Sequence, residues 1–227
     1  DPLQADAAIF YSINNCQKGL RGISFGNFLI KQVVTELTGE FPGIARFATL
    51  SPLPRFREVL EGLDNPGNPI GRPSAEALLA DQAAKLCQAG ERESPVEALF
   101  VLLEAHDAEQ RPMLGEALGR LALAYLARAR RGDTVYDPVA GFHLANGARL
   151  ERINPFADPT PERLSASYGV MVNYLYDPAE VERNHERFVN DGTVTVGKAL
   201  QKELKRVDAA LLAAESPRAR AAGTHHG

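Results

Sequence analysis

Residues 10–34 read FYSINNCQKGLRGISFGNFLIKQVV, and the character of the chain changes twice within this stretch. It opens inside a short apolar run, because residues 7–13 (AAIFYSI) are rich in strand formers. Residues 17–26 then contain three glycines and predict a loop. Residues 28–37 carry apolar side chains at helical spacing. The stretch therefore predicts a strand, a glycine-rich loop and a helix, in that order.

A glycine-rich loop between a strand and a helix is a natural place to bind an anion. The first amides of a helix have no intrahelical partner, and the helix dipole adds partial positive charge there. Glycines let several of these amides point at one ligand. The chain has neither G-x-x-x-x-G-K-[ST] nor G-x-G-x-x-G, so we expect neither a P-loop nor a dinucleotide fold. A phosphate or pyrophosphate site is one interpretation, and a plain tight turn is the other.

The composition excludes several classes of protein. With 227 residues, 44% hydrophobic and 24% charged, the chain has ordinary globular composition. A net charge of −4 argues against nucleic-acid binding, which depends on a surplus of Lys and Arg. Cys16 and Cys87 are too few for a disulfide framework or a zinc site, so we expect a reducing compartment and no bound metal. No apolar run is long enough to cross a membrane, and we expect no membrane partner.

The sequence divides into four parts by composition. Residues 1–63 have the mixed strand and helix pattern that includes the opening stretch. Residues 64–132 begin with a linker rich in proline and glycine and continue as alanine and leucine at helical period, which predicts an all-helical insertion. Residues 133–214 return to a mixed pattern, and residues 215–227 are small and polar, which predicts a disordered tail. The fold class expected is therefore mixed α and β.

Within the insertion we predict three helices. They cover residues 74–89, a segment that begins at the Ser94-Pro95 cap, and residues 112–131, with Gly132 as the stop of the last one. After the insertion, Asp137-Pro138 predicts the start of a short helix that Asn146-Gly147 ends, although Asn-Gly is also a hairpin turn. Further elements are predicted as strands at 148–154 and 169–176, a helix start at 177–180 and a final helix near 196–214.

Four blocks of the sequence resemble malonyl-CoA decarboxylases. The first is the opening stretch, which resembles the coenzyme A-binding segment of that family. The others are EFPGIARFATLSPLPRF, VYDPVAGFHLANGARLERIN and GVMVNYLYD, in the family's order. They cover most of the chain outside the helical insertion and the tail. Four long blocks in order are far more specific than any short motif.

The resemblance implies a GNAT-like acyl-CoA-binding fold. In such folds the glycine loop holds the pyrophosphate of coenzyme A, and two neighbouring strands, here 7–13 and 46–50, splay apart to admit the pantetheine arm. The first strands of the fold have no match in this chain, so we expect an upstream half of the same protein to complete the domain. We also expect a homo-oligomer.

The resemblance also implies the site residues. Ser12 matches the family's active-site serine, His143 lies in its histidine motif, and Tyr176 matches a tyrosine near the site. Histidine suits proton transfer because its ordinary pKa is near neutrality. Taken alone, each of these three residues would be read as a packed and hydrogen-bonded structural residue. The binding residues implied for coenzyme A are Gln17, Lys18, Gly19, Arg21, Gly22, Gly26 and Asn27.

The implied reaction is the decarboxylation of malonyl-CoA to acetyl-CoA and carbon dioxide. The thioester accepts the electrons as an enolate, so no cofactor or metal is expected, and the enolate is then protonated on carbon. Two alternatives remain open: a GNAT-type acyltransferase that uses acyl-CoA, and a non-catalytic acyl-CoA-binding subunit. The chain lacks a C-terminal Ser-Lys-Leu peroxisomal signal, and we expect a cytoplasmic protein.

Overall fold

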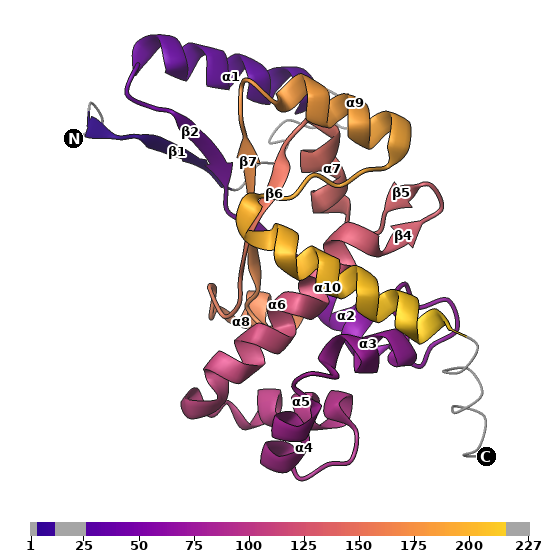
Figure 1. The fold of residues 1–227 in the computed structure, drawn as a ribbon. Coiled ribbons are helices and arrows are strands. Elements are labelled where there is room, and N and C mark those ends of the chain that lie inside the picture. Colours follow the sequence, from indigo (N-terminus) through magenta and orange to yellow (C-terminus); the bar gives the residue numbers. More distant parts are fainter. Residues whose placement is uncertain (1–3, 12–25, 217–227) are drawn as a thin grey trace.

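The computed structural model describes residues 4–11 and 26–216, which form a mixed α+β fold with helices around a small sheet (Figure 1). The strands are β1 (Ala7–Phe10), β2 (Arg46–Thr49), β3 (Ser51–Pro52), β4 (Arg130–Arg131), β5 (Thr134–Val135), β6 (Arg149–Asn154) and β7 (Met171–Tyr176). The helices are α1 (Gly26–Glu40), α2 (Phe56–Glu61), α3 (Arg72–Leu79), α4 (Ala83–Gly90), α5 (Pro95–Ala105), the 3₁₀ turn η3 (Ala108–Gln110), α6 (Arg111–Arg128), α7 (Pro138–Ala145), α8 (Pro161–Ser167), α9 (Val181–Asp191) and α10 (Lys198–Glu215).

Strand β7 is the centre of the main sheet. It pairs antiparallel with β6 along one edge and antiparallel with both β2 and β3 along the other. Strand β1 extends the sheet by pairing parallel with β2. The strands predicted at 148–154 and 169–176 are therefore confirmed as β6 and β7, with slightly shorter bounds.

Strands β2 and β3 are two halves of one strand that is interrupted near Leu50. Phe47 pairs with Tyr176 before the interruption and Ser51 pairs with Val172 after it, in the same register. At the interruption, the Tyr174 amide donates to Thr49 Oγ1 (3.2 Å) and the Asn173 side chain donates to the Thr49 carbonyl (2.7 Å). Hydrogen bonds that involve the Thr49 and Asn173 side chains thus replace the regular ladder hydrogen bonds at this point. They hold the Thr49 hydroxyl against β7.

The expected splaying of strands 7–13 and 46–50 is not present in the part of these strands that the structure describes. Ala7 to Phe10 pair with Arg46 to Thr49, and the Leu50 amide also donates to the Phe10 carbonyl (3.0 Å). These hydrogen bonds keep the two strands together as far as Leu50. Residues 12 and 13 of the predicted strand lie outside the described residues.

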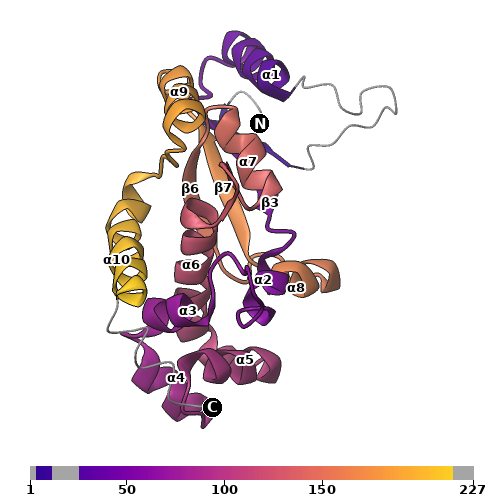
Figure 2. The same ribbon diagram turned by 90° about the vertical axis from the view of Figure 1, so that its right-hand side faces the viewer.

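Helices cover both faces of the β6–β7 pair. Figure 2 shows α7 on one side of the two strands and α10 on the other. Strand side chains alternate between faces, so Tyr174 and Tyr176 of β7 share a face with their partners Thr49 and Phe47 on the neighbouring strand. Helix α7 packs on this face.

The helix predicted at 74–89 is wrong as a single element. The structure has α3, a turn at residues 80–82, and then α4. The turn places Asp81 beside the buried guanidinium of Arg120 on α6, where the two form an ion pair. If the helix continued without a break, Asp81 would be one more residue of α3. The break between α3 and α4 is therefore accompanied by a tertiary contact, which the alanine-rich sequence pattern does not indicate. The helix predicted from Ser94 is confirmed, with Ser94 as the N-cap of α5.

The helix predicted at 112–131 ends earlier than expected. α6 stops at Arg128, and residues 130–131 pair with Thr134–Val135 as the small hairpin β4–β5. Gly132 lies in the turn of this hairpin with a φ of +62°. Its predicted role as the stop of the helix is therefore wrong, because the chain turns at Gly132 to start a strand pairing. The final predicted helix is confirmed as α10.

The short helix predicted from Asp137 is confirmed as α7. Asp137 Oδ1 accepts from the amides of Val139 (3.0 Å) and Ala140 (2.8 Å), and Pro138 occupies the first turn. Asn146 is the C-cap and Gly147 follows with a φ of +79°. The competing hairpin at Asn146-Gly147 is therefore excluded, and both ends of the helix that carries His143 follow from local sequence.

Candidate active site

His143 lies in the last turn of α7 and faces the sheet. Its side chain is buried, with the whole residue only 3% exposed. The imidazole stacks on the ring of Tyr174, with centroids 4.6 Å apart and an interplanar angle of 23°. The capped helix and the tyrosine beneath it hold the ring in one plane.

Both ring nitrogens of His143 have hydrogen-bond partners. Nδ1 lies 2.8 Å from the Tyr176 hydroxyl, and Nε2 lies 3.1 Å from Ser51 Oγ. Ser51 Oγ in turn donates to Thr49 Oγ1 at 2.8 Å. The chain thus brings together β7, α7 and both halves of the interrupted strand. We call His143, Tyr174, Tyr176, Ser51 and Thr49 the His143 cluster.

Burial sets the charge state of this cluster. It lowers the pKa of His143 to about 4, because the charged imidazolium loses its hydration inside the protein. It also raises the pKa of the Tyr176 phenol. At neutral pH the cluster therefore holds a neutral imidazole and a protonated tyrosine. The sequence gives only the ordinary pKa of a histidine, and burial in the folded chain moves the pKa of His143 well below it.

A second buried contact supports the helix that carries His143. The Tyr125 hydroxyl of α6 donates to Asp137 Oδ2 at 3.1 Å, while Asp137 Oδ1 caps α7. Burial raises the pKa of the Asp137 carboxyl, although these hydrogen bonds oppose the shift. Asp137 thus connects α6 to the start of α7, and it positions the helix without reaching the imidazole.

The structure brings together two of the predicted catalytic residues, His143 and Tyr176. It adds Thr49, which the sequence analysis placed inside the strand at 46–50, and Ser51, which directly follows that predicted strand. Period-two alternation of residues 47, 49 and 51 could have placed both hydroxyls on one face of the sheet. Nothing in the sequence indicated that this face would meet α7, because His143 and Ser51 are 92 positions apart.

The remaining predicted site residues are not tested by the structure. Ser12, Gln17, Lys18, Gly19, Arg21 and Gly22 lie outside the described residues. Gly26 and Asn27 are the first two residues of α1, so a helix begins where the predicted loop ends. The coenzyme A-binding loop therefore stays a prediction.

Other groups in the described residues do not form a competing site. Among residues 4–11 and 26–216, no group of three or more His, Cys, Asp or Glu side chains is arranged to hold a metal ion. The Nδ1 atom of His185 on α9 lies 2.6 Å from the Ala145 carbonyl oxygen, a contact between α9 and the end of α7. Within the same described ranges, no helix has the length and apolar character needed to cross a membrane.

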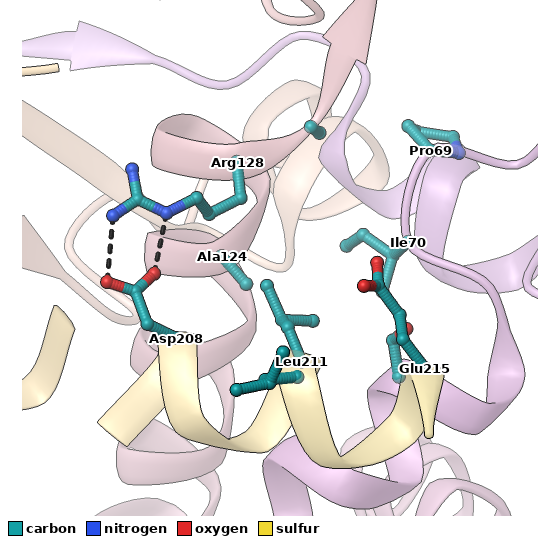
Figure 3. Close-up of a pocket in the computed structure, with 10 residues that line it drawn as sticks. Pro69, Ile70, Ala124, Arg128, Asp208, Leu211 and Glu215 are labelled. Carbon is teal, nitrogen blue, oxygen red and sulfur yellow. Dashed lines mark hydrogen bonds and ion pairs between the residues drawn. The ribbon is translucent and has the colours of Figure 1, made fainter. Parts of the chain in front are cut away.

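A hollow of about 380 Å³ lies apart from the His143 cluster, between α6, α10 and the segment before α3 (Figure 3). Arg128 and Asp208 form an ion pair at its side, with Nε and Oδ1 2.6 Å apart. The residues that line it are Pro69, Ile70, Ser74, Ala124, Arg128, Ala129, Asp208, Leu211, Leu212 and Glu215. None of them belongs to the His143 cluster, so the hollow is not part of the candidate active site.

Comparison with known proteins gives the family. The profile of the malonyl-CoA decarboxylase C-terminal domain matches residues 1–214. The chain belongs to the malonyl-CoA decarboxylase family. The mitochondrial malonyl-CoA decarboxylase of Rattus norvegicus is 37% identical over 199 residues, which is 86% of this chain, and that of Anser anser anser is 39% identical over 181 residues, or 78%.

Solved malonyl-CoA decarboxylases have a similar fold. The structure from Rhodopseudomonas palustris matches with a TM-score of 0.70 and 39% identity over 88% of this chain. The one from Cupriavidus metallidurans matches with a TM-score of 0.68 and 40% identity over 87%. The chain spans 40% and 35% of the two curated relatives named above, and 43% and 48% of these two solved chains. The chain is therefore less than half of each of these relatives, and the activity of a whole enzyme is a proposal for it.

Proposed function

We propose that this chain is the part of a malonyl-CoA decarboxylase that carries the histidine of the active site, and that the complete enzyme converts malonyl-CoA to acetyl-CoA and carbon dioxide. The observation that carries the proposal is the His143 cluster. A buried neutral imidazole with a hydroxyl on each nitrogen lies in a chain of the decarboxylase family. The proposed physiological role is control of malonyl-CoA in fatty acid metabolism.

The chemistry requires stabilised negative charge rather than a cofactor. When the bond to the carboxylate breaks, its electrons pass to the thioester as an enolate and carbon dioxide leaves. One proton, supplied in the end by solvent, then bonds to the α-carbon. A neutral imidazole can donate its N–H to the developing enolate oxygen, because such a donor needs no positive charge to stabilise an oxyanion. The pKa of about 4 favours this role for His143 over that of a preformed cation.

Ser12 is the proposed partner of His143 on the substrate. It lies outside the described residues, two positions after the last residue of β1. Phe10 is paired with Thr49, and Phe10 and Phe47 stack with centroids 6.4 Å apart. A strand that continued with period two would carry residue 12 to the same face as Thr49 and Ser51. We propose that Ser12 and His143 orient the malonyl carboxylate, polarise the carbonyl and return the proton.

Coenzyme A is proposed to bind through the glycine loop and the start of α1, with a GNAT-like arrangement. Two features support this. The order β1, β2, β7, β6 with β1 parallel to β2 suits the second half of such a sheet. α1 begins at Gly26, directly after the predicted loop, and we propose that the first amides of this helix and its dipole bind the pyrophosphate. Gln17, Lys18 and Arg21 are proposed to contact the phosphates at the rim.

The rest of the enzyme is proposed to complete the sheet at β1. In the described part of the chain, β1 pairs on one side only, with β2. Ile9 of this strand and Tyr11, directly after it, are 52% and 74% exposed. An upstream segment of the same protein that paired here would remove an exposed sheet edge. Homo-oligomerisation and a cytoplasmic location are further proposals; the names of the curated relatives given above place those proteins in mitochondria.

The proposed activity is tested by expressing the protein with its natural upstream segment and following malonyl-CoA by mass. Loss of carbon dioxide to give acetyl-CoA is the expected result. Ser12→Ala and His143→Gln should each lower the rate on the order of a hundredfold. His106→Gln is the control, because His106 is exposed at the end of α5.

Three other outcomes contradict parts of the proposal. Transfer of the intact acyl group of a supplied acyl-CoA to an added amine, without release of carbon dioxide, identifies an acyltransferase. Binding of coenzyme A without any turnover identifies an acyl-CoA-binding subunit. Full activity of both Ser12→Ala and His143→Gln shows that the catalytic residues are assigned wrongly.

A further inference from the structure

We propose that Asn173 is a positioning residue for His143, and that it acts through Thr49, whose side chain lies on the opposite face of the sheet. Asn173 lies on β7 at the interruption between β2 and β3, where the paired positions stop at Ala48 and resume at Ser51. Its side chain donates to the Thr49 carbonyl at 2.7 Å. The contact stands on the geometry, and its catalytic consequence rests on the proposed decarboxylase function.

Two backbone carbonyls fix the direction of the hydrogen bonds around Asn173. A carbonyl oxygen only accepts, so the Asn173 atom that faces the Thr49 carbonyl is the amide nitrogen. Its Oδ1 accepts from Asn154 Nδ2 on β6 at 2.8 Å, and Asn154 Nδ2 also reaches the Met171 carbonyl at 3.4 Å. Asn154 therefore orients the Asn173 amide, and the two side chains link β6, β7 and the interrupted strand.

Thr49 connects the two faces of the sheet at this point. Side chains alternate along a strand, so the side chain of Asn173 lies on the face opposite to that of Tyr174. Asn173 holds the Thr49 carbonyl. The Thr49 hydroxyl accepts from the Tyr174 amide (3.2 Å) and from Ser51 (2.8 Å). Ser51 Oγ in turn lies 3.1 Å from His143 Nε2, whichever of the two groups donates.

Burial makes the Asn173 donor difficult to replace. Thr49 is 0% exposed, so water does not reach its carbonyl. An unsatisfied buried acceptor is costly, and a carbonyl that loses its donor therefore turns to another. Another donor that β7 places against Thr49 is the Tyr174 amide, which bonds the Thr49 hydroxyl. If the carbonyl took this amide, the Thr49 hydroxyl would move, and with it the contact of Ser51 with His143.

The consequence concerns the position of the imidazole. Ser51 is the contact of His143 on the Nε2 side, and a displaced Ser51 lets the ring change its angle. In enzymes a misplacement of about 1 Å can cost about a hundredfold in rate. The ring keeps its stacking on Tyr174 and its contact with Tyr176, so we expect a smaller loss here. Asn173 is thus inferred to affect the turnover rate rather than the affinity for coenzyme A.

The test measures the rate and the imidazole in the protein with its natural upstream segment. Asn173→Ala should lower kcat for decarboxylation by about tenfold, with KM within about twofold. The ring ¹⁵N signals of His143, assigned with His143→Gln, should shift in this variant. Asn154→Ala keeps the Asn173 donor and removes only the group that orients it, so kcat should fall by about threefold. This milder variant tests the same contact if Asn173→Ala does not fold.

A double-mutant cycle tests the route from Asn173 to the imidazole. Ser51→Ala alone should lower kcat by about tenfold. Adding Asn173→Ala to it should lower kcat by less than about twofold more, because both residues act through one contact. Independent residues would instead give the product of the two effects, about a hundredfold. A product of this size in the double variant overturns the route through Thr49 and Ser51.

The control is an asparagine whose partners lie outside the His143 cluster. The Asn68 side chain donates to the carbonyls of Val59 and Gly62, each at 2.8 Å, and its Oδ1 accepts from two backbone amides. Asn68→Ala therefore removes more hydrogen bonds than Asn173→Ala does. It should lower the thermal stability while kcat and the ring signals of His143 stay as in the wild type.

Three results decide against parts of the proposal. Unchanged kcat and unchanged ring signals in Asn173→Ala overturn it. A raised KM with unchanged kcat also overturns it, because that result assigns Asn173 to substrate binding. If the wild type releases no carbon dioxide, the proposed function fails and the ring signals alone decide. A shift in Asn173→Ala that is absent in Asn68→Ala then upholds the positioning role.

Discussion

At the scale of single residues, the environment of His143 matters more than its identity. A histidine in solution titrates near pH 6.5, whereas this ring is stacked on Tyr174, 3% exposed and held at a pKa of about 4. Sequence resemblance singled out this residue, and the structure places it in contact with Ser51 and Tyr176. Its neutral state and its hydrogen-bond partners come from groups on three other segments of the chain.

The depressed pKa of His143 predicts a loss of stability in mild acid. The unfolded chain takes up a proton near pH 6.5 and the folded chain only near pH 4, so the unfolded state binds more protons between these values. The stability that the neutral ring contributes is complete above about pH 6.5 and falls as the pH is lowered toward 4. Between pH 7 and 5 the expected loss is about 2 kcal/mol.

The measurement is urea unfolding at both pH values, in the wild type and in His143→Gln. The wild type should lose about 2 kcal/mol more than the variant on acidification. His106→Gln leaves the buried imidazole in place and should behave as the wild type does. Equal losses in the wild type and His143→Gln would contradict the buried neutral state.

At the scale of secondary-structure elements, local signals and tertiary contacts decided different boundaries. The caps at Ser94 and Asp137 marked the starts of α5 and α7 correctly, because a cap acts on amides two or three residues away. The break between α3 and α4 and the hairpin after α6 carry weak local signals. Helices α2 and α8 were not predicted, since each has seven residues or fewer and little room for a periodic pattern.

Gly147 provides the sharpest test at this scale. It follows α7 with a φ of +79°, and a Cβ there would lie 2.1 Å from the Val181 carbonyl oxygen of α9. Gly147→Ala should therefore cost about 3 kcal/mol or more in unfolding free energy, from backbone strain and from the steric overlap. The overlap pushes α7 and α9 apart, so activity should also fall.

Gly192→Ala is the matched control for this substitution. Gly192 also has a positive φ, +63°, but a Cβ there would meet nothing within 4 Å. It should cost only about 1–2 kcal/mol, the penalty of the left-handed backbone alone. Denaturant unfolding of the two variants separates the cost of backbone strain from the cost of the steric overlap with Val181. Similar losses of unfolding free energy in both variants would show that the overlap is unimportant.

At the scale of the whole molecule, one buried arginine connects three helical segments. Arg120 of α6 is 4% exposed, and it contacts Asp81 between α3 and α4, the Leu78 carbonyl (3.0 Å) and Glu203 of α10 (2.5 Å). The core on which these helices pack continues into the sheet that supports the His143 cluster. The packing of α3, α6 and α10 on one another therefore depends on this contact.

Removing Arg120 should destabilise the whole molecule. Arg120→Ala is expected to lower the free energy of unfolding by about 3 kcal/mol, because it removes the ion pairs with Asp81 and Glu203, takes a donor from the Leu78 carbonyl and opens a buried space. Arg128→Ala is the control, since the ion pair of Arg128 with Asp208 is about 40% exposed (36% and 44%) and should contribute about 1 kcal/mol or less. Calorimetric or denaturant unfolding that gave equal losses for both would contradict a special role for Arg120.

The sequence by itself determined the family blocks, the mixed order of strands and helices, and the capped ends of the helix that carries His143. These features depend on residues a few positions apart, and such short-range interactions can be predicted from the sequence pattern. Only the tertiary structure decided that His143 meets Ser51 and Tyr176, that it is neutral, and that the helical region breaks where Asp81 meets Arg120. Those outcomes depend on which faces pack together over long stretches of chain, and on the loss of water that this packing imposes.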